Sequence, residues 1–262
     1  MIRGLRTAAS GMLAQQMSMD TIAHNLANVN TTGFKRIRMA FEDLLYEKLR
    51  PATGQAGESG SPNPLEIGHG SHVVATERLF SQGESETTNN PLDLIIQGEG
   101  FLQFVQPDGT IAYSRDGALK VDSEGRLVNA SGYVLEPEIT LPQDSTSVAI
   151  TTDGRVIAQT AGSTTPAELG QILLARFLNP GALEGQGGNL LQASAAAGDP
   201  VVGAPEELGL GRTIQGSLER SNVQVVEEMV ALIMAQRAFE LNSKAVQSAD
   251  EMLSIVNNLR RI

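Results

Sequence analysis

The sequence contains no cysteine and no tryptophan, and only 4% of its 262 residues are aromatic. The absence of cysteine excludes disulfides, thiolate nucleophiles and metal sites built on cysteine. Because large aromatic side chains are scarce, small residues such as alanine, glycine, serine and threonine must fill much of the interior. The core is therefore modest for the length of the chain, and we expect part of the stability to come from oligomerisation.

Long hydrophobic runs are also missing. No stretch approaches the roughly 18 apolar residues of a membrane-spanning helix. The first 13 residues lack the run of about 7–15 apolar residues that marks a secretory signal. The sequence therefore predicts no membrane span and a chain that is either cytosolic or exported without a cleaved signal peptide.

Positive charge is scarce in the middle of the chain. The net charge is −11 overall. Residues 41–214 carry −14, whereas residues 1–40 carry +4 and residues 215–262 carry −1. This balance argues against nucleic acid as a partner. It indicates an acidic middle that faces solvent between nearly neutral ends that contact protein.

Signatures of catalysis and of cofactor binding are few. The only histidines are His24, His69 and His72, and the last two lie in a glycine-rich stretch where two solvated side chains are the default interpretation. No glycine-rich motif has the spacing of a dinucleotide or phosphate site. Asp93, Glu99 and Asp116 could lie near one another on a sheet, which leaves paired-carboxylate hydrolysis as a minor alternative. We predict no catalytic residue, no metal and no cofactor, and the chain is not expected to be an enzyme.

Both ends of the chain carry a seven-residue apolar repeat, which is the a and d spacing of a coiled-coil seam. The repeat predicts helices over about residues 2–28 and 223–259 that pair as a coiled-coil-like domain. In the N-terminal repeat the positions are Ile2, Leu5, Ala9, Met12, Gln16, Met19, Ala23 and Leu26. From these repeats we predict an assembly interface made of Leu5, Met12, Met19, Leu26, Val225, Leu232, Phe239, Val246 and Leu253.

The length of the second helix favours partners outside the chain. Its 37 residues span about 55 Å, whereas a compact globule of this chain length is roughly 45–50 Å across. Burying the large apolar side chains of the first helix contributes roughly 10 kcal/mol, and ordering its backbone costs roughly 30–50 kcal/mol. We therefore predict ends that are disordered in the monomer and fold on assembly. The repeat alone also fits ordinary two-helix packing inside one subunit.

The middle of the chain reads as consecutive β-hairpins. Four turn glycines, Gly109, Gly117, Gly125 and Gly132, follow one another at intervals of 8, 8 and 7 residues. We predict strands at residues 73–74, 78–80, 92–96, 101–105, 111–114, 118–121, 126–128, 133–135, 148–150, 155–158 and 171–177. Residues 34–49 are predicted as a second helix, residues 51–70 and 181–211 as loops, and Ser221-Asn222 as the N-cap of the last helix.

These elements predict an α+β fold with two domains. Residues 1–71 together with 215–262 form a helical assembly domain with a loop extension at 34–71, and residues 72–214 form a β-rich domain.

One segment carries a more specific signal. Residues 23–35 read AHNLANVNTTGFK, which resembles the N-terminal signature of bacterial flagellar rod and hook axial proteins. The resemblance continues, in order, through residues 41–46, 75–78 and 113–117 and into the C-terminal helix. The residues that match the signature are Asn25, Leu26, Ala27, Asn28, Thr31, Gly33, Phe34 and Lys35.

This resemblance implies a structural function. Members of the family are exported unfolded through the flagellar export apparatus, without a cleaved signal, and polymerise into a hollow helical shaft that crosses the periplasm and peptidoglycan and carries torque from motor to hook. Terminal helices form the inner wall of the tube, and the β-rich part forms the outer layer. Expected partners are copies of the chain itself, proximal rod and hook proteins, and the surrounding ring proteins.

Within the family, residues 41–46 favour the distal rod. The alternatives are another axial protein, proximal rod or hook, and less strongly a peptidoglycan-binding or hydrolysing module.

Overall fold

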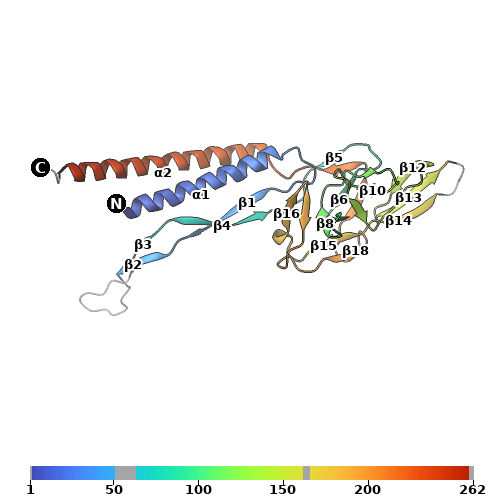
Figure 1. The fold of residues 1–262 in the computed structure, drawn as a ribbon, viewed down its shortest axis with the longest axis horizontal. Helices are drawn as coiled ribbons and strands as arrows, with labels where there is room; N and C mark the ends of the chain where they lie inside the picture. The colour runs from blue at the N-terminus through green and yellow to red at the C-terminus, as the bar shows by residue number, and fades with distance from the viewer. Residues whose placement is uncertain (1, 51–62, 162–165, 260–262) are drawn as a thin grey trace. The chain divides into compact units, whose positions relative to one another are not determined.

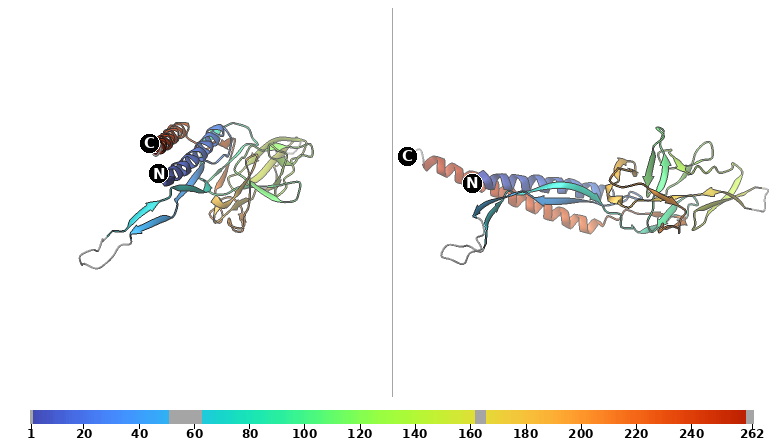
Figure 2. Two further views of the ribbon diagram at one scale, coloured as in Figure 1. Left: turned by 60° about the vertical axis from the view of Figure 1, so that its left-hand side comes forward. Right: turned by 90° about the horizontal axis from the view of Figure 1, so that it is seen from below.

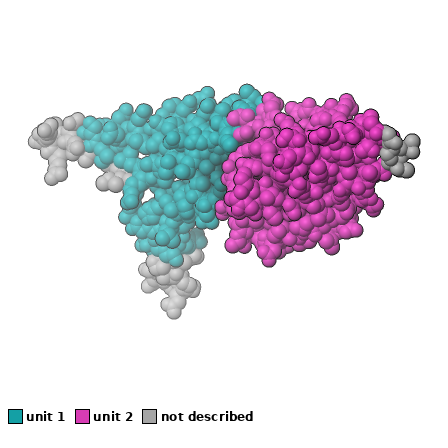
Figure 3. All heavy atoms as spheres, turned by 45° about the vertical axis from the view of Figure 1, so that its right-hand side comes forward, with its two compact units in different colours: residues 1–26, 37–77, 225–262 teal, residues 27–36, 78–224 magenta. Residues whose placement is uncertain are grey.

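The structure, a computed structural model, describes residues 2–50, 63–161 and 166–259, and it forms two compact units (Figures 1 and 3). Unit 1 comprises residues 1–26, 37–77 and 225–262, and unit 2 comprises residues 27–36 and 78–224. A helix at each end and a strand-rich middle make the fold α+β, which confirms the predicted class. The division differs from the predicted boundaries, because residues 72–77 group with unit 1 and residues 27–36 and 215–224 with unit 2.

The two helices of unit 1 are α1 (Ile2–Ala27) and α2 (Val225–Leu259), and they run antiparallel in contact (Figure 1). A Cβ atom on Gly11 would lie 2.9 Å from Asn242 Nδ2, and Asn25 Nδ2 donates a hydrogen bond of 3.2 Å to Glu228 Oε2. These two contacts are 14 residues apart on each helix, so the register between the helices stays constant. Neither described helix is long and apolar enough to cross a membrane. Coiled-coil packing of the pair stays a prediction.

Residues 37–78 form a two-stranded β-arm in the described parts of this stretch: β1 (Ile37–Asp43) pairs with β4 (Ser71–Arg78), and β2 (Tyr46–Arg50) pairs antiparallel with β3 (Leu65–Gly68). The predicted helix over residues 34–49 is therefore wrong, and the predicted loop over residues 51–70 is wrong at residues 65–68, which form β3. The apolar residues of this stretch recur every four positions, and a spacing of four places side chains on one face of a helix and also on one face of a strand. Residues 51–62 lie outside the described part of the chain.

Unit 2 is built on a seven-stranded antiparallel sheet in the order β16-β17-β8-β7-β11-β10-β9. The remaining strands form a three-stranded sheet, β12-β13-β14, and the pairs β15-β18, β19-β6 and β20-β5. Three of the four predicted hairpins between residues 101 and 136 are confirmed, because β7 pairs with β8, β9 with β10, and β10 with β11. The predicted hairpin at Gly117 is wrong, because β8 lies between β17 and β7 and β9 lies at the far edge of the sheet. Gly109, Gly125 and Gly132 take the positive φ angles that these turns need.

The bounds of the unit 2 elements follow in chain order: β5 Ser85–Thr87, β6 Leu94–Gln97, β7 Leu102–Val105, β8 Ile111–Ser114, β9 Lys120–Val121, β10 Leu127–Val128, β11 Val134–Glu136, β12 Ser145–Ile150, β13 Arg155–Thr160, β14 Ala167–Gln171, β15 Leu174–Arg176, the 3-10 helix Pro180–Ala182, β16 Glu184–Gly187, β17 Leu190–Gln192, β18 Val201–Gly203, β19 Arg212–Gln215 and β20 Ser217–Glu219.

The core of unit 2 lies against this sheet. Its fully or almost fully buried side chains include Phe104, Leu102, Leu127, Leu135, Ile139, Val156, Ile172 and Leu174. The predicted loop over residues 181–211 is wrong, because it contains β16, β17 and β18. β16 reads EGQG, has no apolar residue and is exposed throughout, so it is ordered by pairing with β17 rather than by a pattern visible in its sequence.

The predicted N-cap is also wrong, since α2 begins only at Val225. The side chain of Asn222 is used elsewhere in unit 2. Its Oδ1 accepts a hydrogen bond of 2.7 Å from the Arg36 amide, and its Nδ2 donates to the carbonyl oxygens of Leu79 and Ser81. Asn222 therefore joins three backbone segments instead of capping the helix.

Gly117 is required for steric reasons, because a methyl group there would overlap the carbonyl oxygen of Leu94. We expect Gly117→Ala to lower the free energy of unfolding of unit 2 by about 3 kcal/mol, the upper end for overpacking. Gly109→Ala is the control: it meets no atom within 4 Å and is strained only by a φ of +81°, which costs about 1–2 kcal/mol. Urea unfolding followed by circular dichroism measures both, and equal losses would contradict this account.

Candidate assembly site

The predicted interface residues of α1 are half-buried. They are Leu5, Met12, Met19 and Leu26. The alternate positions of the predicted repeat, Ala9, Gln16 and Ala23, are exposed. The residues one position earlier are less accessible: Ala8 and Gln15 are half-buried, and Ile22 is buried. The inward stripe of α1 therefore keeps the seven-residue period, with its second position shifted by one residue.

In α2 four of the predicted residues, Leu232, Phe239, Val246 and Leu253, are half-buried, whereas Val225 is 40% exposed. Between them the inward stripe is completed by Glu228, Ala235, Asn242 and Ala249. These small or polar residues were missed because a search for large apolar side chains passes over them. Small residues at alternate positions let the two helix backbones approach closely, as the contact of Gly11 with Asn242 shows.

The first three turns of α2 expose apolar side chains to solvent. This outward face consists of Val226, Met229, Val230, Ile233 and Met234, which are 52–74% exposed. On α1, Leu13 and Met17 are 58% and 42% exposed. Clustered exposed apolar residues of this kind mark surfaces that bind protein.

The β-arm exposes a second apolar set that the sequence analysis did not single out. Its members are Phe41, Leu45, Tyr46, Leu49, Leu65, Ile67 and Val74, and Leu45 is 87% exposed. Burial is low because the arm has only two strands and therefore no interior of its own. Its sequence signal was the four-residue spacing of Phe41, Leu45 and Leu49, which fits one face of a strand as well as one face of a helix.

The C-terminal half of the signature segment, residues 23–35, is held in unit 2 by a buried ion pair. Lys35 Nζ lies 2.5 Å from Glu219 Oε1 and donates to the Ser81 carbonyl oxygen at 2.7 Å, and both charged side chains are at most 3% exposed. Burial lowers the pKa of Lys35, and the Glu219 carboxylate opposes that shift. The same carboxylate accepts a hydrogen bond from the Gly83 amide and lies 3.8 Å from Arg115.

Gly33 allows the chain to turn toward this pair. Its φ is +66°, and a Cβ atom on it would lie 2.6 Å from the Asp116 nitrogen. Its amide donates to the Glu219 carbonyl oxygen at 2.8 Å, while Thr31 Oγ1 donates to Asn28 Oδ1 at 3.2 Å just before it. The polar residues of the signature thus have structural partners: they close a turn and fix it to β20. Of the other signature residues, Leu26 and Phe34 are half-buried and Ala27 is exposed.

The N-terminal half of the signature contributes Asn25, which is 1% exposed and lies in unit 1. Its Nδ2 donates to the Ile37 carbonyl oxygen at 2.8 Å, and its Oδ1 accepts from the Ile37 amide at 2.9 Å. The remaining hydrogen of Nδ2 reaches Glu228 of α2. One side chain therefore connects α1, β1 and α2.

The three carboxylates of the hydrolase alternative are each engaged in local structure. Asp93 accepts hydrogen bonds from Thr88 and Asn90, and Glu99 pairs with Arg176 at 2.9 Å. Asp116 accepts from the Ala118 amide and from Asn189. The described residues contain no group of three metal-ligating side chains, and His69 lies 3.9 Å from Glu47.

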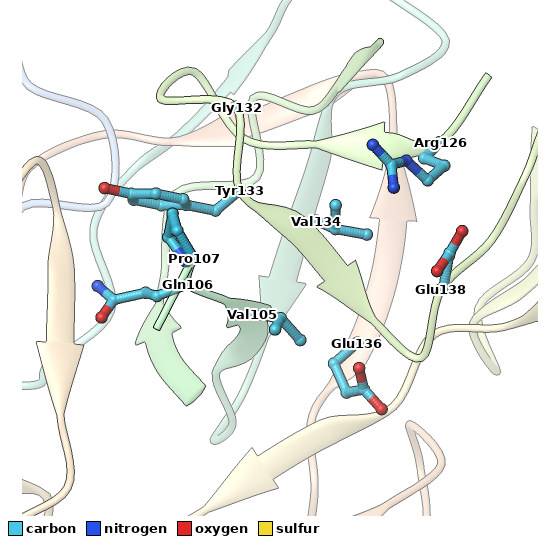
Figure 4. A pocket seen from close by; sticks show the side chains of 9 residues that line it. All are labelled: Val105, Gln106, Pro107, Arg126, Gly132, Tyr133, Val134, Glu136 and Glu138. Atoms are coloured by element: carbon cyan, nitrogen blue, oxygen red, sulfur yellow. The ribbon is translucent and has the colours of Figure 1, made fainter. Parts of the chain in front are cut away.

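A cavity of about 390 Å³ opens on the surface of unit 2 beside β10 and β11 (Figure 4). It is lined by Val105, Gln106, Pro107, Arg126, Gly132, Tyr133, Val134, Glu136 and Glu138. Arg126 is already paired with Asp122 at 2.9 Å and with Glu124 at 3.1 Å. Glu136 is exposed and Arg126 is committed to its two carboxylate partners, so the rim resembles a solvated surface rather than a pair of carboxylates poised for hydrolysis.

Comparison with known families gives the class of protein. Residues 5–35 match the family described as flagella basal body rod protein, residues 95–158 match the flagellar hook protein FlgE/F/G D1 domain, and residues 214–259 match the flagellar basal body rod FlgEFG protein C-terminal family. The two helices and the sheet described above are therefore the modules of the axial proteins of the bacterial flagellum.

Relatives along the full length narrow the class. The chain is 49% identical to the flagellar basal-body rod protein FlgG of Borreliella burgdorferi, with all of both chains covered. It is 43% identical to that of Caulobacter vibrioides, over 99% of this chain and all of the relative, and 36% identical to that of Bacillus subtilis, with both fully covered. The chain belongs to the family of flagellar basal-body rod proteins.

The buried Lys35–Glu219 pair yields a stability test. We expect Lys35→Met to lower the free energy of unfolding by about 3–5 kcal/mol, because Glu219 keeps a buried charge without its closest partner. Lys35→Met combined with Glu219→Gln removes that charge and costs less. Arg155→Met breaks the exposed pair with Asp153 and is the control, with a loss below about 1 kcal/mol. Urea denaturation measures the free energy of unfolding of each variant. If Lys35→Met alone loses no more stability than Arg155→Met, the Lys35–Glu219 pair does not have the structural role described here.

Proposed function

We propose that this chain is the structural subunit of the distal rod of the bacterial flagellum. Copies polymerise into a hollow helical shaft that transmits torque from the motor to the hook. The observation that carries the proposal is the outward apolar face of α2, which a single chain leaves in water. The full-length similarity to basal-body rod proteins gives this face its expected partner, namely further copies of the chain.

The small number of buried residues in unit 1 supports the same conclusion. Among its described residues only Ala14, Ile22, Asn25, Glu228, Ala235 and Ala249 are buried, and only Ile22 is a large apolar side chain. Ordering a helix costs about 1–2 kcal/mol per residue in backbone entropy, so burial of this extent within one chain is insufficient. Contacts between copies supply the missing burial.

The predicted interface residues are part of this proposal. Leu5, Met12, Met19, Leu26, Leu232, Phe239, Val246 and Leu253 retain partial exposure, so a neighbouring copy can cover what the α1–α2 contact leaves open. The repeated contact is between different surfaces of adjacent copies, which generates a helix rather than a closed ring. The β-rich unit 2, which carries most of the negative charge, forms the outer layer.

The same proposal covers location and partners. The subunit is exported through the flagellar export apparatus and assembles in the basal body, in the part of the rod that crosses the periplasm and peptidoglycan. It joins proximal rod proteins at one end and hook proteins at the other, inside the ring proteins. Its contribution is mechanical, and no catalytic step is assigned to it.

A charge on the outward face of α2 tests the interface. Ile233 is 57% exposed, so Ile233→Glu changes little of the packing within one chain but places an unpaired charge in the contact between copies. We expect the concentration needed for polymerisation to rise at least tenfold, measured by sedimentation and electron microscopy. Gln247→Glu, an exposed polar position of the same helix, is the matched control. Normal rods from Ile233→Glu would contradict the proposed interface.

The sparse burial of unit 1 also predicts the state of the free monomer. We expect backbone amides of α1 and α2 to exchange rapidly in the monomer and to become protected in the polymer. Amides in the core strands β7 and β8 of unit 2 should be protected in both states and serve as the internal control. Nuclear magnetic resonance of the monomer measures this, and fully protected helical ends would be incompatible with folding on assembly.

A further inference from the structure

The β-arm has no source of order within itself. Its described strands β1 to β4 contain no buried residue, and an isolated two-stranded ribbon is marginally stable at best in water. Its position must therefore come from what it contacts in unit 1. Figures 1 and 2 show α1 lying between α2 and the arm, so α1 is the surface on which the arm rests.

Among the described residues, the contacts between the arm and α1 include the following three. Arg3 pairs with Glu47 at 2.9 Å, but both side chains are more than a third exposed, and such an exposed pair contributes little to stability. Gly70 packs closely against Ser10, because a side chain on Gly70 would overlap the serine hydroxyl. The third contact, between Asn25 and Ile37, is the only one of the three made by a buried polar side chain.

The Asn25–Ile37 contact has the form of a strand pairing. The side-chain amide donates to the carbonyl oxygen of Ile37 and accepts from its amide, as a neighbouring strand would. Ile37 is the first residue of β1, so this pairing fixes the point at which the arm begins. Leaving these two backbone groups buried without partners would be unfavourable.

The same side chain also contacts the second helix. After the bond to Ile37, the remaining N–H of Asn25 donates to Glu228 Oε2, and Glu228 is itself 1% exposed in the first turn of α2. An amide is the only side chain of this size that can donate twice and accept once in this arrangement. Separation of α2 from α1 would remove this partner from Asn25.

We propose that Asn25 couples the order of the β-arm to the pairing of α1 with α2. While the helices are apart, the arm is loose. When they pair, Glu228 closes over Asn25, and the pairing with Ile37 fixes β1 and, through it, β4. A consequence, which rests on the assembly function proposed above, is that the exposed apolar residues of the arm become a defined surface only in a subunit whose helices are already in place.

The test separates helix pairing from arm order in a single chain and needs no polymer. Because the chain has no cysteine, Gly11→Cys with Asn242→Cys allows one disulfide to lock α1 to α2; a Cβ at position 11 lies 3.4 Å from Asn242 Cγ. In this locked chain, hydrogen exchange of β1 and β4 is compared with that of α1 and α2. Failure of the disulfide to form would contradict the register on which the proposal depends.

Asn25→Asp is the decisive variant, because it keeps the size of the side chain but loses both donors. We expect exchange in β1 and β4 to accelerate at least tenfold, with the locked helices changed little. Adding Glu228→Gln supplies an amide that can donate to the introduced carboxylate and removes the repulsion between two carboxylates, but it cannot restore donation to the Ile37 carbonyl. Exchange in the arm should therefore stay fast in the double variant.

Ile22→Ala is the matched control, since it removes a buried side chain one turn earlier on α1 without touching the arm's hydrogen bonds. In the locked chain the disulfide keeps the helices paired, so Ile22→Ala should leave exchange in the arm comparatively unaffected even where it speeds exchange within the helices. The proposal is overturned if Asn25→Asp leaves arm exchange unchanged, if Glu228→Gln fully restores it, or if Ile22→Ala loosens the arm equally. Loss of polymerisation in any variant bears on the assembly function and not on this coupling.

Discussion

The structure of unit 1 depends on α1 being covered on two sides. One side of this helix meets α2 and the other meets the β-arm (Figure 2). Neither of those elements has an interior of its own, so each is ordered through α1. The contacts within the chain are made largely by small or polar residues, such as Gly11 against Asn242 and Asn25 against Glu228. They define geometry more than they contribute free energy, as expected of a part that is completed by its neighbours.

Unit 2 follows the opposite principle. Its sheet buries Phe104, Leu102 and Leu127 completely, and its hairpins are closed by turns that suit their sequences. It even buries charge, in the Lys35–Glu219 pair beside Arg115. Burying ions is costly unless they are well paired, and the benefit here is a fixed place for residues 33–35 against β20. A self-sufficient unit and a dependent one are thus joined in one chain.

Sequence reasoning succeeded where turn residues report on adjacent strands, and it failed where one apolar spacing fits both a helix and a strand. The hairpins at Gly109, Gly125 and Gly132 were predictable, because turn glycines and short apolar runs report directly on neighbouring strands. The same signal at Gly117 failed, because β8 and β9 pair with other strands of the sheet. The β-arm was predicted as helix because Phe41, Leu45 and Leu49 are four residues apart, which satisfies both periodicities. The strand β16 and the role of Asn222 were not predictable, since both depend on partners distant in the sequence, which the residues around them do not reveal.

The sequence by itself determined the two terminal helices, the β-rich middle, the absence of cysteine chemistry and, through the signature at residues 23–35, the family. These are properties of composition and of short-range order. Only the tertiary structure decided what the signature does: Asn25 binds the backbone of β1 and reaches α2, and Lys35 is buried against Glu219. The physical reason is that a buried polar side chain must find a hydrogen-bond partner, and which partner it finds is set by the fold around it.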